Sequence, residues 1–207
     1  MVNNIFCIGR NYVAHAHELG NDVPEEPLIF TKPTHALTAA TGQTIYFPGN
    51  KGALHYEAEL VVKMGRDYEA GLPVDALISD MTIGLDLTYR DIQAQLKAKG
   101  HPWTIAKGFP NAAIIGNWLP FPGEKTCLNH TYSLDINKER VQIGDMNLMI
   151  FPLIEQITYI GTHIGLGKND IIFTGTPEGV GPLNSGDTLE LNWDKQTVGS
   201  CTIHIDS

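Results

Sequence analysis

Glycine and proline divide this sequence into short segments. The chain has 21 glycines and 12 prolines among 207 residues, about 16% against the roughly 12% of an average protein. Both residues end regular structure or form tight turns, so we expect many short strands and few long helices. The hydrophobic share of 43% lies close to the globular norm, so the segments between the turns can bury a core.

Hydrophobic patterning places the expected elements along the chain. Helices are expected at 11–19, ended by Gly20, from a capping box formed by Thr88 and Asp91 to about Lys99, and from Pro152 to about 164. The region 42–52 is expected to be rich in turns. Strands are expected at 5–8, 28–30, 55–64, 83–87, 134–136, 171–173, 188–193 and 198–205. Many short strands with a few helices predict an α+β fold with a β-rich core.

The charge balance excludes some partners. Fourteen basic against 23 acidic side chains give a formal net charge of −9, which repels nucleic acid and anionic membrane surfaces. No apolar run approaches the roughly 18 residues that a membrane span needs. The three cysteines, Cys7, Cys127 and Cys201, lie far apart and predict no disulfide framework. The start of the chain lacks the features of a signal peptide, so we expect a cytoplasmic protein.

Two glutamates stand one residue apart in a segment that is otherwise apolar. Side chains alternate between the faces of a strand, so Glu57 and Glu59 are expected to point the same way. Asp86 is the only charged residue of the predicted strand 83–87. A solvated strand face would account for the glutamates alone. With Asp86 they also form a set of hard oxygen ligands that suits Mg²⁺, Mn²⁺ or Ca²⁺ rather than Zn²⁺.

His15 and Glu18 lie three residues apart on a predicted helix and therefore share a face. Glu18 can orient His15 and raise its basicity, as a general base requires. An ordinary surface contact is the alternative interpretation.

Three basic side chains stand in apolar or turn-rich surroundings. Lys32, Arg90 and Lys107 are either surface charges or, beside a metal site, groups that hold a substrate carboxylate or a developing oxyanion. The glycine-rich segment 174–182 is either a wide turn or a wall of an active site.

Taken together, these motifs resemble the fumarylacetoacetate hydrolase family, above all its small single-domain acylpyruvase and oxaloacetate-decarboxylase-like members. The resemblance spans nearly the whole chain. It is carried by Gly9-Arg10-Asn11-Tyr12 with His15 and Glu18, Phe30-Thr31-Lys32-Pro33, His55-Tyr56-Glu57-Ala58-Glu59, Leu85-Asp86-Leu87-Thr88-Tyr89-Arg90-Asp91-Ile92-Gln93, Pro102-Trp103 with Ala106-Lys107, and the segment 174–182.

The resemblance implies a β-rich roll of mixed sheets, one catalytic domain over residues 1–207, and a homodimer. It implies that Glu57, Glu59 and Asp86 bind Mg²⁺ or Mn²⁺. It also implies three catalytic residues, His15, Glu18 and Lys107. The implied substrate-binding residues are Arg10, Tyr12, Lys32, Arg90, Gln93 and Thr176.

The predicted activity is hydrolysis of a C–C bond in a 2,4-dioxo acid such as acetylpyruvate or fumarylpyruvate, giving pyruvate and a carboxylic acid. The same metal site also fits an oxaloacetate decarboxylase or tautomerase, or a 2-hydroxy-dienedioate isomerase. A non-catalytic metal-binding protein is the remaining alternative. The expected partner is a small 2-oxo acid, and neither nucleic acid nor a membrane is expected.

Overall fold

The computed structural model describes residues 1–18, 20 and 22–206. Leu19, the last residue of the first predicted helix, lies outside the described residues. Among the described helices, none has the length and hydropathy that a transmembrane segment requires.

An eight-stranded mixed sheet forms the centre of the molecule. Its strands follow the order β2-β1-β13-β6-β7-β9-β3, and β10 pairs with β7 beside this path. The β1–β13 and β3–β9 pairs are parallel and the others are antiparallel. The strands are β1 (Ile5–Gly9), β2 (Leu28–Lys32), β3 (Leu37–Ala39), β6 (Ala58–Met64), β7 (Ile78–Asp86), β9 (Ala113–Ile115), β10 (Leu119–Pro120) and β13 (Ile171–Phe173).

Two smaller sheets complete the β structure. The five-stranded sheet has the order β12-β11-β15-β16-β4, and the three-stranded sheet has the order β14-β5-β8. The first contains β4 (Thr41–Phe47), β11 (Thr131–Ile136), β12 (Glu139–Asp145), β15 (Thr188–Trp193) and β16 (Gln196–Ile205). The second contains β5 (Leu54–Tyr56), β8 (Thr88–Tyr89) and β14 (Gly181–Pro182).

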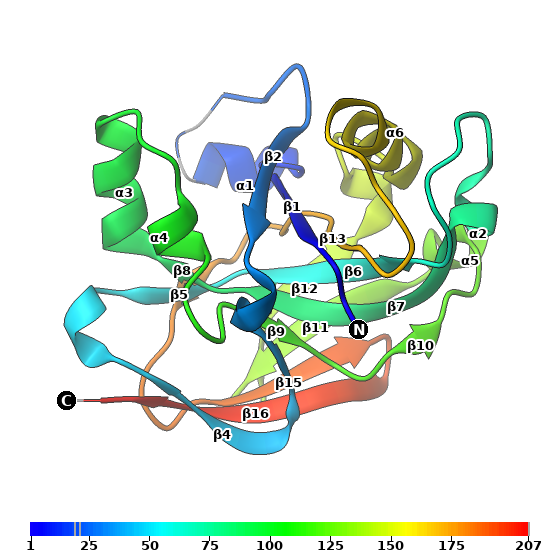
Figure 1. Ribbon diagram of the computed structural model, residues 1–207. Helices are drawn as coiled ribbons and strands as arrows, with labels where there is room; N and C mark the ends of the chain where they lie inside the picture. Colours follow the sequence, from blue (N-terminus) through cyan, green and yellow to red (C-terminus); the bar gives the residue numbers. More distant parts are fainter. Residues whose placement is uncertain (19, 21, 207) are drawn as a thin grey trace.

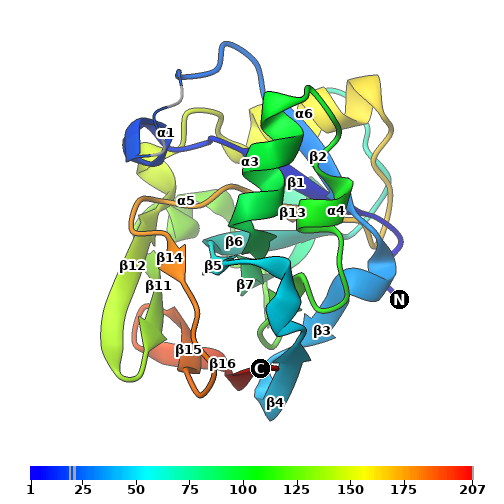
Figure 2. The same cartoon turned by 90° about the vertical axis from the view of Figure 1, so that its left-hand side faces the viewer.

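Short helices cover the central sheet on the side away from the five-stranded sheet (Figure 1). Figure 2 shows α3 and α4 side by side next to β2. The α-helices are α1 (Val13–Glu18), α2 (Val74–Leu77), α3 (Arg90–Ala98), α4 (Thr104–Lys107), α5 (Glu124–Cys127) and α6 (Leu153–His163). Three 3₁₀ turns occur at Thr34–Ala36, Gly49–Lys51 and Met146–Leu148.

The two faces of β6 contribute to two different hydrophobic clusters. Leu60 and Val62 belong to the larger cluster, which joins the central sheet, the five-stranded sheet and α6. Val61 belongs to a smaller cluster with residues of β1, β9 and β13. Because side chains alternate along a strand, Glu59 lies on the side of Val61. The structure confirms the α+β class and the β-rich roll of mixed sheets.

Local structure differs from the sequence-based expectation at three places. The predicted strand 55–64 is interrupted at Glu57, where the chain passes from the three-stranded to the central sheet. The region expected to be turn-rich contains β4, which pairs in parallel with β16. The predicted capping box is wrong, since Thr88 donates to the carbonyl of Asp86 and Asp91 accepts from the backbone N–H of Ala53.

Gly144 provides a test of how the five-stranded sheet is packed. It lies opposite Tyr132 across the β11–β12 pair, and a Cβ at this position would lie 2.0 Å from Cζ of the Tyr132 ring. Overpacking of this kind costs about 1–3 kcal/mol, and each kcal/mol lowers the midpoint of a chain of this size by about 2–4 °C. We therefore expect Gly144→Ala to lower the thermal unfolding midpoint by several degrees.

The neighbouring exposed residue is the matched control. Ile143 is 55% exposed on the same strand, so Ile143→Thr keeps a β-branched side chain and should leave the midpoint almost unchanged. Equal midpoints for Gly144→Ala and the unmodified chain, measured by calorimetry, would contradict the close packing of Gly144 against the Tyr132 ring.

Candidate functional site

A small cavity opens where the central and three-stranded sheets meet. Its volume is about 40 Å³, above the roughly 10–15 Å³ that one water molecule requires. Ionisable and polar side chains contribute much of its wall. The cavity is lined by Ile8, Gly9, Arg10, His15, Phe30, Glu57, Glu59, Asp86, Arg90, Gln93, Lys97, Trp103, Lys107 and Thr176.

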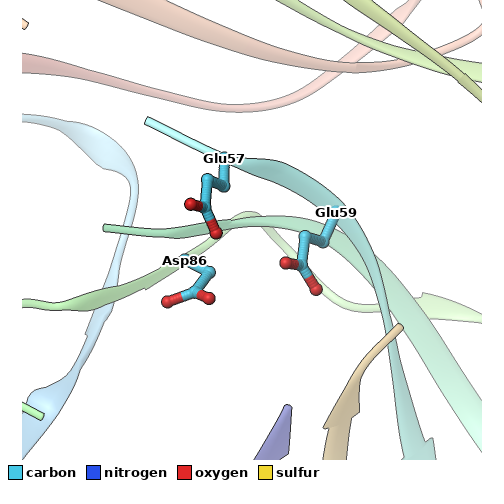
Figure 3. A group of neighbouring side chains, drawn as sticks. All are labelled: Glu57, Glu59 and Asp86. Atoms are coloured by element: carbon cyan, nitrogen blue, oxygen red, sulfur yellow. The ribbon is translucent and has the colours of Figure 1, made fainter. Parts of the chain in front are cut away.

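Three buried carboxylates meet in this cavity (Figure 3). Glu57 occupies the break between β5 and β6, Glu59 follows on β6, and Asp86 is the last residue of β7. The backbone N–H of Asp86 donates to the carbonyl of Glu57 at 2.9 Å, which aligns the two strand ends. One carboxylate oxygen from each residue lies within 4.8 Å of the other two. Sheet pairing therefore sets the separation of the three groups.

Cationic side chains neutralise two of the three carboxylates. Lys107 Nζ contacts Glu57 at 2.7 Å and Asp86 at 2.6 Å. Arg90 pairs with Glu57 at 2.5 Å, and Lys32 pairs with Asp86 at 2.6 Å. Burial raises the pKa of Glu57, but Lys107 and Arg90 more than offset it and hold that pKa well below its ordinary value. Glu57 is thus held as a charged group, and the Asp86 carboxylate lies between two lysine ammonium groups.

Glu59 has a different environment from the other two carboxylates. It is 2% exposed, and its Oε2 accepts a hydrogen bond of 2.7 Å from the backbone N–H of Gly175. No lysine or arginine among the described residues forms an ion pair with it. Burial, then the charges of Asp86 and Glu57, raise the pKa of Glu59 well above its ordinary value. A further cation in the cavity would favour its charged form.

The donor set fits a hard divalent cation. All three ligands are carboxylates, which Mg²⁺, Mn²⁺ and Ca²⁺ prefer. Oxygen ligands lie about 2.0–2.6 Å from such ions, so two oxygens on the same ion lie at most about 4–5 Å apart. The separations within 4.8 Å meet this requirement. The triad is therefore a candidate divalent metal site.

A histidine–glutamate pair on α1 faces the same cavity. His15 is 4% exposed and lines the cavity, and its Nδ1 lies 3.3 Å from Glu18 Oε2. The Glu18 carboxylate also accepts from the backbone N–H of Gly179, with its Oε1 at 3.1 Å. Glu18 thereby connects α1 to the segment 174–182 and fixes the orientation of the imidazole.

The segment 174–182 forms part of the cavity wall. Thr176 lines the cavity, and its hydroxyl donates to the carbonyl of Ala58 at 2.9 Å. Gly175 has φ +101°, and a Cβ there would lie 2.5 Å from Cβ of Asn11. Only glycine combines this backbone conformation with this close approach, and it brings the Gly175 N–H to Glu59.

Two buried amides support this wall and were missed by the sequence analysis. Gln142 Nε2 donates to Thr176 Oγ1 at 2.9 Å, while its Oε1 accepts from the backbone N–H of Ala58 at 2.9 Å. Asn11 Nδ2 donates to the carbonyl of Thr174 at 2.7 Å. Asn11 lies within a motif that carries the resemblance, whereas no local pattern identifies Gln142.

Most of the residues predicted for the site line the cavity, and three do not. Glu18 contacts the lining residue His15, and Lys32 contacts the lining residue Asp86. The Tyr12 side chain lies elsewhere, with its hydroxyl 3.0 Å from that of Tyr132. Tyr12 is therefore not among the residues that line the cavity. The lining residues among the predicted set are Arg10, His15, Glu57, Glu59, Asp86, Arg90, Gln93, Lys107 and Thr176.

Comparison with known proteins identifies close relatives. The protein named oxaloacetate tautomerase YcgM from Escherichia coli K12 is 38% identical over 202 residues, which cover 95% of this chain and 91% of that protein. The mitochondrial oxaloacetate tautomerase FAHD1 of Arabidopsis thaliana is 42% identical over 188 residues, covering 89% of this chain and 83% of that protein.

A solved relative has the same fold with ligands bound. The crystal structure of fumarylpyruvate hydrolase from Pseudomonas aeruginosa, in complex with Mn²⁺ and pyruvate, matches with a TM-score of 0.89 and 32% identity. The match covers 99% of this chain and 91% of that one.

A family profile matches almost the full length of the sequence. The profile described as Fumarylacetoacetate (FAA) hydrolase C-terminal aligns with residues 4–205. Together with the relatives above, this match confirms the resemblance seen in the sequence motifs. The chain belongs to the fumarylacetoacetate hydrolase family.

Proposed function

We propose that this protein is a divalent-metal-dependent oxaloacetate tautomerase, which interconverts the enol and keto forms of oxaloacetate. The observation that carries the proposal is the convergence of three buried carboxylates in a small cavity that also contains His15 and Lys107. A non-catalytic metal protein would need the carboxylates but neither His15 nor Lys107.

The names of two relatives favour tautomerisation over the hydrolysis that the sequence motifs suggested. Both the Escherichia coli and the Arabidopsis proteins are named oxaloacetate tautomerases. Tautomerisation also requires less of the site than hydrolysis, because one proton moves between carbon and oxygen and no water attacks the substrate.

Glu57, Glu59 and Asp86 would hold Mg²⁺ or Mn²⁺ through their carboxylate oxygens. Divalent-ion binding there would supply Lewis-acid stabilisation of negative charge on the 2-oxo oxygen of the substrate. The Mn²⁺ in the structure of the Pseudomonas aeruginosa relative supports this class of ion.

The proton is assigned to His15. In the direction from enol to keto, the enol O–H is lost and a C–H bond forms at C3, so one group must deliver a proton to carbon. His15 is buried in the cavity wall, and its Nδ1 is paired with Glu18, which leaves Nε2 for the substrate. Glu18 acts as a positioning residue, since it contacts the imidazole and the Gly179 N–H.

Lys107 is assigned to the substrate oxygen. Burial opposes its charge, but Asp86 and Glu57 more than offset burial and raise the pKa of Lys107. The ammonium therefore stays protonated at neutral pH and donates hydrogen bonds to negative charge that develops on oxygen.

Hydrolysis of acylpyruvates remains a second candidate, favoured by one specific observation. The His15–Glu18 pair, at 3.3 Å, is suited to remove a proton from water as well as to move one at carbon. The Pseudomonas aeruginosa relative is a fumarylpyruvate hydrolase. Comparing enol-oxaloacetate ketonisation with cleavage of acetylpyruvate and fumarylpyruvate in one preparation separates the two, and faster cleavage would favour the hydrolase.

Three further expectations stay predictions. They are that residues 1–207 act as one catalytic domain, that the protein is a homodimer, and that it is cytoplasmic. Sedimentation of the purified protein measures the second directly, and fractionation of the source cells measures the third. The Arabidopsis relative is named as a mitochondrial protein, so the fractionation would test the cytoplasmic location against a different one.

Replacement of a metal ligand should weaken metal binding. Loss of an outer partner of a metal ligand already costs about 10–100-fold in metal affinity, so we expect Glu59→Gln to weaken Mn²⁺ binding at least as much. Titration calorimetry measures the affinity, and ketonisation of enol-oxaloacetate measures activity before and after chelation.

Glu190→Gln is the matched control, because Glu190 is an exposed strand carboxylate on β15. It should bind Mn²⁺ and turn over like the unmodified protein. Full activity of the chelated protein, or unchanged Mn²⁺ affinity in Glu59→Gln, would contradict the proposed metal site.

Replacement of His15 should reduce turnover while leaving the metal bound. A positioned general acid or base contributes about 10²–10⁴ in rate, so we expect His15→Ala to lower kcat for ketonisation by that range. Mn²⁺ affinity should remain within about twofold, since His15 is not among the three ligands. Unchanged kcat at saturating metal would exclude His15 as the proton donor.

A further inference from the structure

Two aromatic side chains stand between the cavity and a second hollow on the surface. Phe30 on β2 and Trp103, the residue before α4, line the cavity and also line an open groove of about 320 Å³. Their ring centroids lie 5.7 Å apart, and α4 packs against β2 (Figure 2). Neither residue is among those predicted for the site. This aromatic pair is therefore a wall that the cavity and the groove share.

The aromatic pair lies directly beyond the lysine of the metal site. Lys107 Nζ is 2.6 Å from Asp86 and 5.1 Å from the centroid of the Phe30 ring, within the roughly 6 Å of a cation–π contact. Trp103 contacts Phe30 in turn. A ligand that is held at the triad and extends past Lys107 toward β2 therefore meets these two rings.

The cavity is too small for a long ligand while the aromatic pair closes it. Its volume of about 40 Å³ holds on the order of three water molecules. A 2-oxo acid with a long carbon chain contains many more non-hydrogen atoms than that. Without the indole of Trp103, the cavity would be continuous with the groove of about 320 Å³.

The groove differs from the cavity in its chemistry. The described residues that line it include no aspartate, glutamate, lysine or arginine, and His101 is its ionisable side chain. Leu28, Ile29 and Pro102 contribute apolar surface. Such a groove suits an uncharged alkyl or acyl chain, whereas the cavity suits the charged end of a 2-oxo acid.

We propose that the aromatic pair limits the chain length of the 2-oxo acid that the site accepts, with Trp103 as the residue that determines this specificity. A chain that continued past the pair would occupy the groove. The inference rests on the proposed function, because it assumes that the carboxylate and 2-oxo group of the ligand face the triad. It accounts for a preference for short 2-oxo acids over those with long alkyl or acyl chains.

The side chain of Trp103 can be changed without removing the support of α4. The Trp103 backbone carbonyl accepts hydrogen bonds from the N–H groups of Ala106 at 2.8 Å and Lys107 at 3.0 Å. Replacement of the indole leaves these bonds in place, so Lys107 keeps its position. Phe30 is less suitable for replacement, because its ring lies beside the Lys107 ammonium.

The test compares two ligands that differ only in chain length. The probes are 2-oxobutyrate and 2-oxooctanoate, which share the 2-oxo acid group and lack a second carbonyl that could be cleaved. Titration calorimetry measures the binding of each to the Mn²⁺-loaded protein, for the unmodified chain, Trp103→Ala and Trp103→Leu. The measurement does not depend on turnover.

The unmodified protein should bind 2-oxobutyrate more tightly than 2-oxooctanoate. Each further CH₂ group that leaves water strengthens binding by up to about fourfold. We therefore expect Trp103→Ala to strengthen binding of 2-oxooctanoate by at least about tenfold and to change that of 2-oxobutyrate by less than about twofold. Trp103→Leu should give a smaller gain, because its side chain still fills part of the opening.

A second substitution tests whether the long chain lies in the groove. Thr104 is exposed and lines the groove but not the cavity. Addition of Thr104→Glu to Trp103→Ala places a carboxylate beside the apolar chain and should remove most of the gain for 2-oxooctanoate. An unchanged gain would contradict the groove as the place of the chain.

Trp118→Ala is the matched control. Trp118 is a partly buried tryptophan that packs on the smaller hydrophobic cluster and lines neither the cavity nor the groove. The same truncation there should leave both affinities unchanged. Thermal unfolding establishes that each variant is folded, and Trp103→Leu carries the test if Trp103→Ala does not fold.

The outcomes separate the chain-length proposal from the proposed function. A 2-oxooctanoate affinity of the unmodified protein equal to or above that for 2-oxobutyrate, an equal gain for both ligands, or no gain in either Trp103 variant would overturn the proposal. Chain-length selection without ketonisation of enol-oxaloacetate would support the role of Trp103 and contradict the tautomerase assignment. Binding of neither acid to the Mn²⁺-loaded protein would contradict both.

Discussion

The neutralisation of the buried carboxylates Glu57 and Asp86 is the interaction on which the site depends. Isolated charges cannot be taken out of water without compensation, and the chain supplies it from several elements. Lys32 comes from β2, Arg90 from α3 and Lys107 from α4. These contacts fasten two helices and an edge strand to the junction of two sheets. Burial of the acids therefore organises this side of the fold as well as the candidate metal site.

The strand break at Glu57 explains why the site lies at this junction. A continuous strand would keep all its residues in one sheet, whereas here the chain moves from β5 into β6 at Glu57 and from β7 into β8 just after Asp86. The two points at which the chain changes sheet lie side by side, since the Asp86 N–H donates to the Glu57 carbonyl. The cavity opens at this point, and Glu57 and Asp86 are among the residues that line it.

Much of the site follows from local sequence rules, and the exceptions have physical causes. Alternation along a strand was enough to place Glu57 and Glu59 on one side, and the i, i+3 spacing was enough to pair His15 with Glu18. Gln142 could not be found in this way, because it bonds to Ala58, 84 positions away along the chain. The predicted capping box was wrong because the Asp91 carboxylate accepts a hydrogen bond from the backbone N–H of Ala53, just before β5, and does not cap its own helix. In both cases a tertiary contact determines the role of a polar side chain.

The position of Gln142 has a consequence for how this pocket can diversify. Gln142 belongs to the outermost strand of the five-stranded sheet, yet it holds both the start of β6 and the segment that carries Thr176. The shape of the pocket therefore depends also on the five-stranded sheet, although none of the described residues of that sheet lines the cavity. A chimera that exchanged only the cavity loops between two family members would inherit a mismatched support for those loops. Successful exchange of activity would require β12 to be transplanted together with them.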